Sequence, residues 1–284
     1  MHPARTPGYF SFGYLPAGDL RSDIGGRLFG VPNLLKRLQA MDILRAMDVQ
    51  PTDTVLDFGC GSGYITVELA KLARKAIGVD INNYIETVPI PAPLVGRLEY
   101  KQCSGVSLPF SDGSFDRILA SEVLPMLPDP AAFLASMRRV LKPDGRLVVM
   151  NGLGFPFLRD AYARNAPRLQ ALARRYPGRF PATYDAYCAE FQKAAGTGRT
   201  NFMTEENVLD ALSASGFHVQ AKSYAPRRRA GEWIGWNQFE LYLESGRVVP
   251  AVRFLPRFLF LSALNAMDSE PYLGGLIVVA TNRQ

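Results

Sequence analysis

The sequence predicts an α/β fold with a doubly wound, mainly parallel sheet, and two observations carry that prediction. The apolar, β-rich run Thr54 to Phe58 stops at a loop with glycine at every second position, and an amphipathic helical pattern begins directly after it at Tyr64. A strand that leads through such a loop into a helix N-terminus is typical of this fold. Leu147 to Met150 is apolar throughout, as expected for a strand that is covered on both faces.

The elements around the loop follow from local patterns. Residues 1–30 are rich in glycine, proline and aromatic residues without a clear period, which predicts an irregular arm. From Val31 to Met47 the apolar residues recur mainly at three- and four-residue steps, which indicates a helix. The second strand is expected at Ala76 to Ile81 and a short third strand at Leu98 to Gln102. Three prolines between Asn82 and Gly96 exclude a long regular helix there.

Two helices carry cap signals. Asp129 can accept hydrogen bonds from the first free backbone N–H groups of a helix that begins at Pro130. We expect that helix to end at the turn Pro143 to Gly145. Thr204 is expected to cap a helix that runs through Ala214. Arginine- and tyrosine-rich helices are expected within residues 157–195, and the last two strands at Phe217 to Tyr224 and Leu276 to Thr281.

Composition bounds the kind of protein. A chain of 284 residues can bury a sizeable core. Its three cysteines are odd in number and lack metal-ligand spacing, so we expect no metal site, reduced thiols and a cytoplasmic location. We find no signal-peptide pattern in residues 1–23 and no run of 18 apolar residues, so we expect no transmembrane segment.

The net charge is concentrated in one part of the chain. Residues 151–230 hold 12 Lys/Arg and 6 Asp/Glu, which accounts for the whole formal charge of +6. This is either a solvated basic face or a surface that meets an anionic substrate or an acidic membrane. We expect no nucleic-acid partner, because the sequence has no separate recognition module.

The glycine loop shows which ligand to expect. Gly59, Gly61 and Gly63 allow close approach of a ligand, since no Cβ blocks the backbone. A dinucleotide fingerprint would need its third glycine at position 64, where this chain has Tyr64. Asp57 precedes the loop. Together with the segments 76–81, 107–116 and 139–147, this pattern resembles the class I S-adenosylmethionine-dependent methyltransferases of the small-molecule type over residues 50–151.

The resemblance implies a seven-stranded Rossmann-like sheet and S-adenosylmethionine as cofactor. It places Asp57 near the methionine ammonium, the loop backbone on the methionine portion and Asp80 on the ribose hydroxyls, with Ile81 packing on the adenine. Many relatives carry an aspartate where this chain has Ser104. A serine can still accept a hydrogen bond from the adenine amine, but it carries no charge, which suggests weaker cofactor binding. The residues expected at the cofactor are Asp57, Gly59, Cys60, Gly61, Gly63, Asp80, Ile81, Cys103 and Ser104.

The catalytic residue is less clear. Methyl transfer from a sulfonium is an in-line displacement that mainly needs positioning and exclusion of water. The two histidines, His2 and His218, are expected to be structural, so a histidine base is not expected. Glu122 follows the predicted fourth strand at the sheet edge where ligands bind. It is the candidate catalytic residue, as a general base. A contact to acceptor or cofactor and a structural role remain open.

The predicted organisation is an arm (1–30), a cofactor-binding core (31–154, 201–224, 274–284) and two cap insertions (155–200, 225–273). Within the second insertion, residues 248–264 are apolar but interrupted by proline and arginine. They are cap core, a peripheral membrane contact or a dimer face. The expected activity is methylation, at oxygen, of a small or amphiphilic molecule in a natural-product, lipid or glycan biosynthetic pathway. A non-catalytic scaffold and a nucleic-acid methyltransferase are the alternatives.

Overall fold

The computed structural model describes residues 34–82, 85–86, 88–103, 108–151, 166–178, 204–225, 227–230 and 275–282, with the single positions 233, 260, 263, 264 and 267. The predicted arm, most of both predicted caps and Ser104 lie outside the described residues. In chain order the elements are α2 (Leu34–Met47), β1 (Thr54–Phe58), α3 (Tyr64–Leu72), β2 (Lys75–Asp80), η2 (Ala92–Leu94), β3 (Leu98–Gln102), β4 (Phe115–Ser121), η3 (Leu124–Met126), α4 (Pro130–Val140), β5 (Leu141–Asn151), α6 (Ala166–Arg175), α8 (Glu205–Ala214), β6 (His218–Tyr224) and β7 (Leu276–Thr281).

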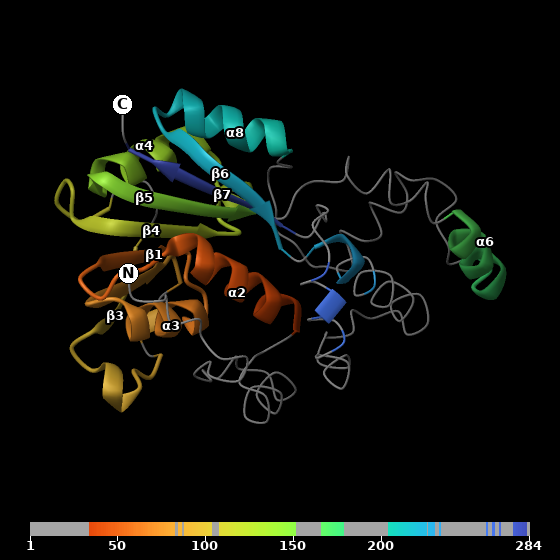
Figure 1. Ribbon diagram of the computed structural model, residues 1–284, viewed down its shortest axis with the longest axis horizontal. Helices are drawn as coiled ribbons and strands as arrows, with labels where there is room; N and C mark the ends of the chain where they lie inside the picture. The colour runs from red at the N-terminus through yellow and green to blue at the C-terminus, as the bar shows by residue number, and fades with distance from the viewer. Residues whose placement is uncertain are drawn as a thin grey trace.

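The strands form one seven-stranded sheet in the order β3-β2-β1-β4-β5-β7-β6 (Figure 1). Strands β1 to β5 are parallel, and β7 runs antiparallel to both β5 and β6. The chain moves outward from β1 to β3 and then returns to the other side of β1 to add β4. The strand order therefore reverses between β1 and β4, which is where open α/β sheets bind ligands. The predicted doubly wound fold is confirmed.

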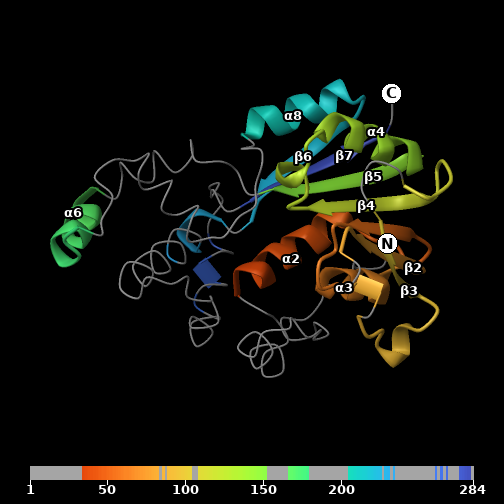
Figure 2. The ribbon, with the colours of Figure 1, turned by 180° about the vertical axis from the view of Figure 1, so that it is seen from behind.

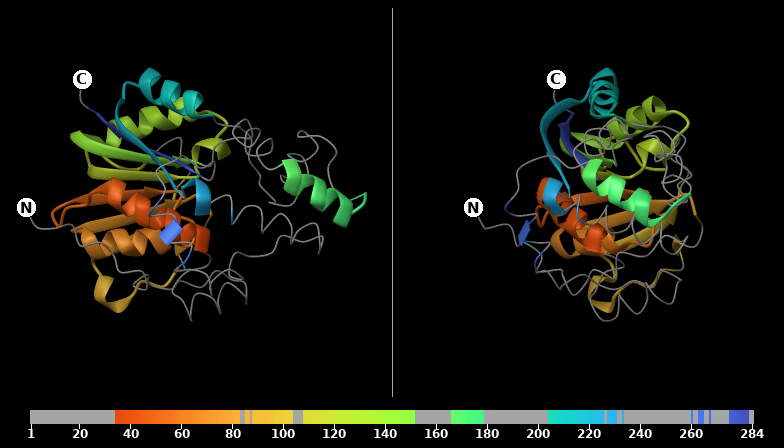
Figure 3. Two further views of the ribbon diagram at one scale, coloured as in Figure 1. Left: turned by 45° about the vertical axis from the view of Figure 1, so that its right-hand side comes forward. Right: turned by 90° about the vertical axis from the view of Figure 1, so that its right-hand side faces the viewer.

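Helices cover both faces of the sheet. Helices α4 and α8 lie on one face, and α2 and α3 lie on the other (Figure 2). Phe115 and Phe133 are fully buried under α4 and α8, while Ile43, Met47 and Leu69 are fully buried on the α2 and α3 side. Helix α6 stands away from these layers, as two further views show (Figure 3). None of the helices in the described part of the chain is both long and apolar enough to cross a bilayer.

The two predicted helix caps are present. The Asp129 carboxylate accepts from the Ala132 N–H at 2.9 Å, and Pro130 occupies the first turn of α4. The Thr204 hydroxyl accepts from the Asn207 N–H at 3.1 Å at the start of α8. Both helices therefore begin where a side-chain oxygen satisfies a backbone donor that has no partner inside the helix.

Two element boundaries differ from expectation. Strand β5 begins at Leu141, directly after α4, and the register of the β4–β5 ladder shifts between the partners of Phe115 and Arg117. The predicted turn at 143–145 is therefore an irregularity within β5. Strand β2 ends at Asp80, so Ile81 lies beyond the strand and is 67% exposed.

Candidate functional site

The glycine loop is tied to the neighbouring strand. The N–H groups of Gly59 and Cys60 both donate to the Val79 carbonyl, at 2.8 and 3.0 Å, and the Gly63 N–H donates to the Cys60 carbonyl at 2.9 Å. The φ angles of the three glycines are 71°, 54° and 75°, a region that other residues rarely adopt. The loop is thus a tight, fixed turn at the switch point of the sheet.

The three glycines face different surroundings. A Cβ on Gly59 would lie 2.5 Å from Val123 Cγ2, and one on Gly63 would lie 2.7 Å from Tyr100 Cζ. A Cβ on Gly61 would meet no atom within 4 Å. Gly59 and Gly63 are therefore required by packing, whereas Gly61 leaves its backbone open for a ligand to approach.

The start of α3 is built differently from the starts of α4 and α8. Gly63 is its N-cap residue, and no side chain caps the helix. The first backbone N–H groups of a helix carry partial positive charge and bind anionic groups. The loop thus presents unblocked backbone donors beside Gly61.

Asp80 organises the carboxyl end of β2. Its Oδ2 accepts from the Gly61 N–H at 3.0 Å, and its Oδ1 accepts from the Asn82 backbone N–H at 3.0 Å and from the Asn82 side chain at 2.8 Å. A carboxylate offers about four acceptor positions, so capacity remains for a ligand hydroxyl. The buried Cys103 follows β3, and its N–H donates to the Asp80 carbonyl at 2.8 Å. Asp80, Ile81 and Cys103 therefore lie together at one edge of the sheet.

Asp57 is the buried carboxylate of the site. It is 3% exposed and accepts from the Thr66 hydroxyl at 2.6 Å. Burial raises the pKa of Asp57 to about 7; the Thr66 hydrogen bond counteracts this, and the charge of Asp80 adds to it. A cation placed beside Asp57 would stabilise its charged form.

Glu122 occupies a strained position where β4 ends. Its φ is 60°, unusual for a residue with a side chain, and its N–H donates to the Met150 carbonyl at 2.6 Å. Such backbone strain is found most often at functional sites. Burial raises the pKa of Tyr64, and the charges of Asp57 and Glu122 raise it further.

Sequence reasoning missed three residues of this site. Thr66 holds Asp57, Asn82 holds Asp80, and the Tyr100 hydroxyl donates to the Gly63 carbonyl at 3.2 Å. No sequence signal marks Thr66 or Tyr100, because their partners are set by the packing of α3 and β3. His218 pairs with Thr281 at the amino end of the sheet, opposite the glycine loop, and its side chain is exposed.

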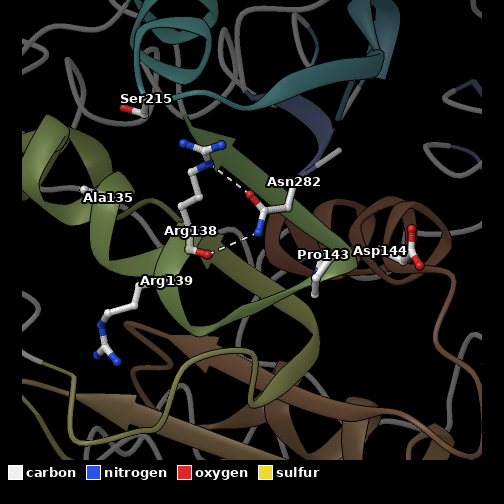
Figure 4. Close-up of a pocket in the computed structure, with 7 residues that line it drawn as sticks. All are labelled: Ala135, Arg138, Arg139, Pro143, Asp144, Ser215 and Asn282. Atoms are coloured by element: carbon white, nitrogen blue, oxygen red, sulfur yellow. Dashed lines mark hydrogen bonds between the residues drawn. The ribbon is translucent and has the colours of Figure 1, made fainter. Parts of the chain in front are cut away.

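A hollow of about 670 Å³ lies at the amino end of the sheet (Figure 4). Asn282 accepts from Arg138 Nε at 3.0 Å and donates to the Arg138 and Leu141 carbonyls, both at 3.3 Å. Arg139 donates to Phe110 O and Leu108 O. The Asn282 contacts fix the end of β7 to α4 and to the start of β5, and the Arg139 contacts fix α4 to the segment 108–110. The hollow is lined by Ala135, Arg138, Arg139, Pro143, Asp144, Ser215 and Asn282.

Comparison with protein families agrees with this geometry. Residues 56–149, which run from β1 to the end region of β5, match the family described as "Methyltransferase domain". Residues 56–149 form a class I S-adenosylmethionine-dependent methyltransferase domain. The resemblance stated from the glycine loop and its flanking segments is thereby confirmed, and S-adenosylmethionine is the cofactor of this domain class.

Relatives of this methyltransferase domain cover only part of the chain. The ubiquinone/menaquinone biosynthesis C-methyltransferase UbiE of Teredinibacter turnerae is 33% identical over 123 residues, 41% of this chain and 49% of its own length. The Klebsiella pneumoniae protein of that name is 35% identical over 129 residues, 43% of this chain and 50% of its own. The chain thus spans about half the length of the curated relatives it matches.

Solved structures show the same fold. An S-adenosylmethionine-dependent methyltransferase from Mesorhizobium loti superposes with a TM-score of 0.52 at 16% identity, covering 87% of this chain and 97% of its own. The [4+2]-cyclase SpnF superposes with a TM-score of 0.53 at 17% identity, covering 86% of this chain and 80% of its own. Because a cyclase shares the fold, the fold alone does not assign the reaction.

Proposed function

We propose that this protein transfers a methyl group from S-adenosylmethionine to a small or amphiphilic acceptor. The observation that carries the proposal is the glycine loop, which is hydrogen-bonded to Asp80 and leaves Gly61 open beside the uncapped start of α3. Asp57 would face the methionine ammonium, and the α3 N-terminus would hold the methionine carboxylate. Asp80 would take the ribose hydroxyls.

The adenine would lie against the exposed Ile81, on the side of the buried Cys103. When bound, the cofactor supplies an electrophilic methyl group. The protein has to align the acceptor atom with that group and exclude water. Glu122, at the end of the neighbouring strand β4, would contact the acceptor. We propose that it accepts the proton of an acceptor hydroxyl, the role predicted from the sequence.

For the acceptor we propose an aromatic ring that bears hydroxyl or carbonyl groups. The support is the quinone pathway and the carbon-methylating activity in the names of the relatives. A hydroxylated ring offers both an oxygen and an activated ring carbon as nucleophile, so it accommodates the O-methylation predicted from the sequence and the C-methylation of those relatives. Labelled methyl transfer from carbon-13 cofactor, followed by NMR of the product, distinguishes the two atoms. Peripheral membrane contact and the cytoplasmic location stay untested predictions.

Ligand preference tests the proposed cofactor. Calorimetry should show binding of S-adenosylmethionine and S-adenosylhomocysteine and none of NAD, since Tyr64 stands where a dinucleotide loop has its third glycine. Heat changes with NAD and none with the two methionine cofactors would overturn the proposal. Binding of the methionine cofactors without transfer to any hydroxylated aromatic would leave the scaffold alternative.

A matched pair of glycine variants tests the open face of the loop. Gly61→Ala and Gly113→Ala place a methyl group at φ 54° and 61° respectively, and neither added Cβ meets an atom within 4 Å. Both should lower the free energy of unfolding by a similar amount, about 1 kcal/mol. Gly61→Ala alone should weaken S-adenosylmethionine binding, by roughly tenfold or more, because its methyl group lies where the ligand approaches. Equal cofactor affinities of the two variants would show that the ligand does not approach Gly61.

A further inference from the structure

The last residue of β5 carries a polar side chain that the packing does not satisfy. Asn151 is fully buried, at 0% exposed. Among the described residues, neither its Nδ2 nor its Oδ1 has a hydrogen-bond partner. Buried polar groups are nearly always paired, and leaving one unpaired costs its full desolvation. An amide kept in this state needs a role beyond the packing of the unliganded protein.

The backbone places Asn151 beside the cofactor site. It pairs with Leu276 of β7 and ends the strand at the carboxyl edge of the sheet, one strand beyond β4 from the glycine loop (Figure 1). Ligands of this fold bind outside that edge. Neighbouring strands lie about 4.8 Å apart, so β5 is about 10 Å from β1, the length of a small acceptor.

The neighbouring residues connect Asn151 to Glu122. The carbonyl of Met150 accepts the Glu122 N–H at 2.6 Å, so the strained end of β4 is bonded to the residue before Asn151. Side chains alternate along a strand, which puts Asn151 on the same face as the buried Leu147 and Val149. The amide thus stands at the carboxyl end of this buried apolar layer.

We propose that Asn151 binds the methyl acceptor by a hydrogen bond to a hydroxyl or carbonyl group and selects acceptors that carry one. This rests on the proposed methyltransferase function. An amide donates through Nδ2 and accepts through Oδ1, so it fits a ring hydroxyl and a ring carbonyl equally. A site with such a buried polar group rejects a hydrocarbon of the same shape, because the group then stays unpaired.

Two asparagine variants separate this role from a structural one. Asn151→Leu removes an unpaired amide, whereas Asn282→Leu removes an amide with three hydrogen bonds at the opposite end of the sheet. We expect Asn151→Leu to raise the melting temperature by roughly 2–6 °C and Asn282→Leu to lower it. A fall for Asn151→Leu would overturn the proposal, since it would show that the amide stabilises the unliganded fold.

Fluorescence titration with 1-naphthol and naphthalene, in saturating S-adenosylhomocysteine, tests recognition directly. Wild type and Asn282→Leu should prefer 1-naphthol by about tenfold or more, and Asn151→Leu should lose most of that preference. An unchanged preference in Asn151→Leu, or none in wild type, would refute the role of Asn151.

Calorimetry of wild type with S-adenosylmethionine distinguishes failure of this proposal from failure of the proposed function. If the cofactor binds and the preference does not depend on Asn151, the inference alone fails, whereas if the cofactor does not bind, both fail.

Discussion

Replacing Asp80 with alanine should weaken S-adenosylmethionine binding by roughly 10- to 150-fold, which corresponds to about 1.5–3 kcal/mol for a lost charged hydrogen-bond partner. The structure gives two reasons for the loss. Asp80 would contact the ribose, and it already accepts the Gly61 N–H at 3.0 Å, so it also holds the loop. For the same reason we expect a measurable loss of folding stability. A strand-end carboxylate with little packing would by itself leave folding intact, so the expected loss rests on the Gly61 hydrogen bond.

A ligand pair separates the two roles of Asp80. Wild type should bind adenosine more tightly than 2′,3′-dideoxyadenosine, because only adenosine offers hydroxyls to the carboxylate. Asp80→Ala should bind both with similar, low affinity. If the variant still discriminates between them as wild type does, Asp80 holds the loop and does not bind the ribose. Asp112→Ala, which removes an exposed carboxylate on a remote turn, serves as the control.

The parts of the site that are local in sequence could be predicted. Gly59 to Gly63 form one turn, and the strand before it and the helix after it show their own periodicity. The caps Asp129 and Thr204 likewise act on backbone groups three residues away. Where residue type and a short spacing decide the conformation, the sequence was sufficient.

The parts that depend on distant segments could not be predicted. Thr66 meets Asp57 because α3 folds back across β1, and within the described part of the chain the buried Asn151 amide has no hydrogen-bond partner. The strained Glu122 is hydrogen-bonded to Met150, 28 positions later in the chain. The sequence marked Glu122 by its place after β4, but only the tertiary contacts indicate its strain and its link to β5.

Asp57→Asn should make the unliganded protein more stable, by about 2–4 kcal/mol at pH 8. Burial raises the pKa of Asp57 from 3.8 to about 7 in the folded protein. The folded state therefore holds a proton that the unfolded chain has released, and the stability of the wild type falls as pH rises from about 4 to 7. Above pH 7 the penalty is complete. Asparagine has no charge to desolvate, and its side-chain oxygen can still accept the hydrogen bond from the Thr66 hydroxyl.

Urea unfolding at pH 5 and pH 8 measures this penalty. The difference in unfolding free energy between Asp57→Asn and wild type should be larger at pH 8 than at pH 5, and a difference independent of pH would show that Asp57 is not desolvated.

The same substitution should have the opposite effect on cofactor binding, which it should weaken. Wild-type affinity for S-adenosylmethionine should increase between pH 6 and pH 8 as Asp57 becomes charged, since the anion then faces the methionine ammonium. Asp57→Asn should bind more weakly and lack that increase. Because the variant retains any titration of the ligand amine, the difference between the two pH profiles isolates Asp57. Identical profiles would place the ammonium away from this carboxylate.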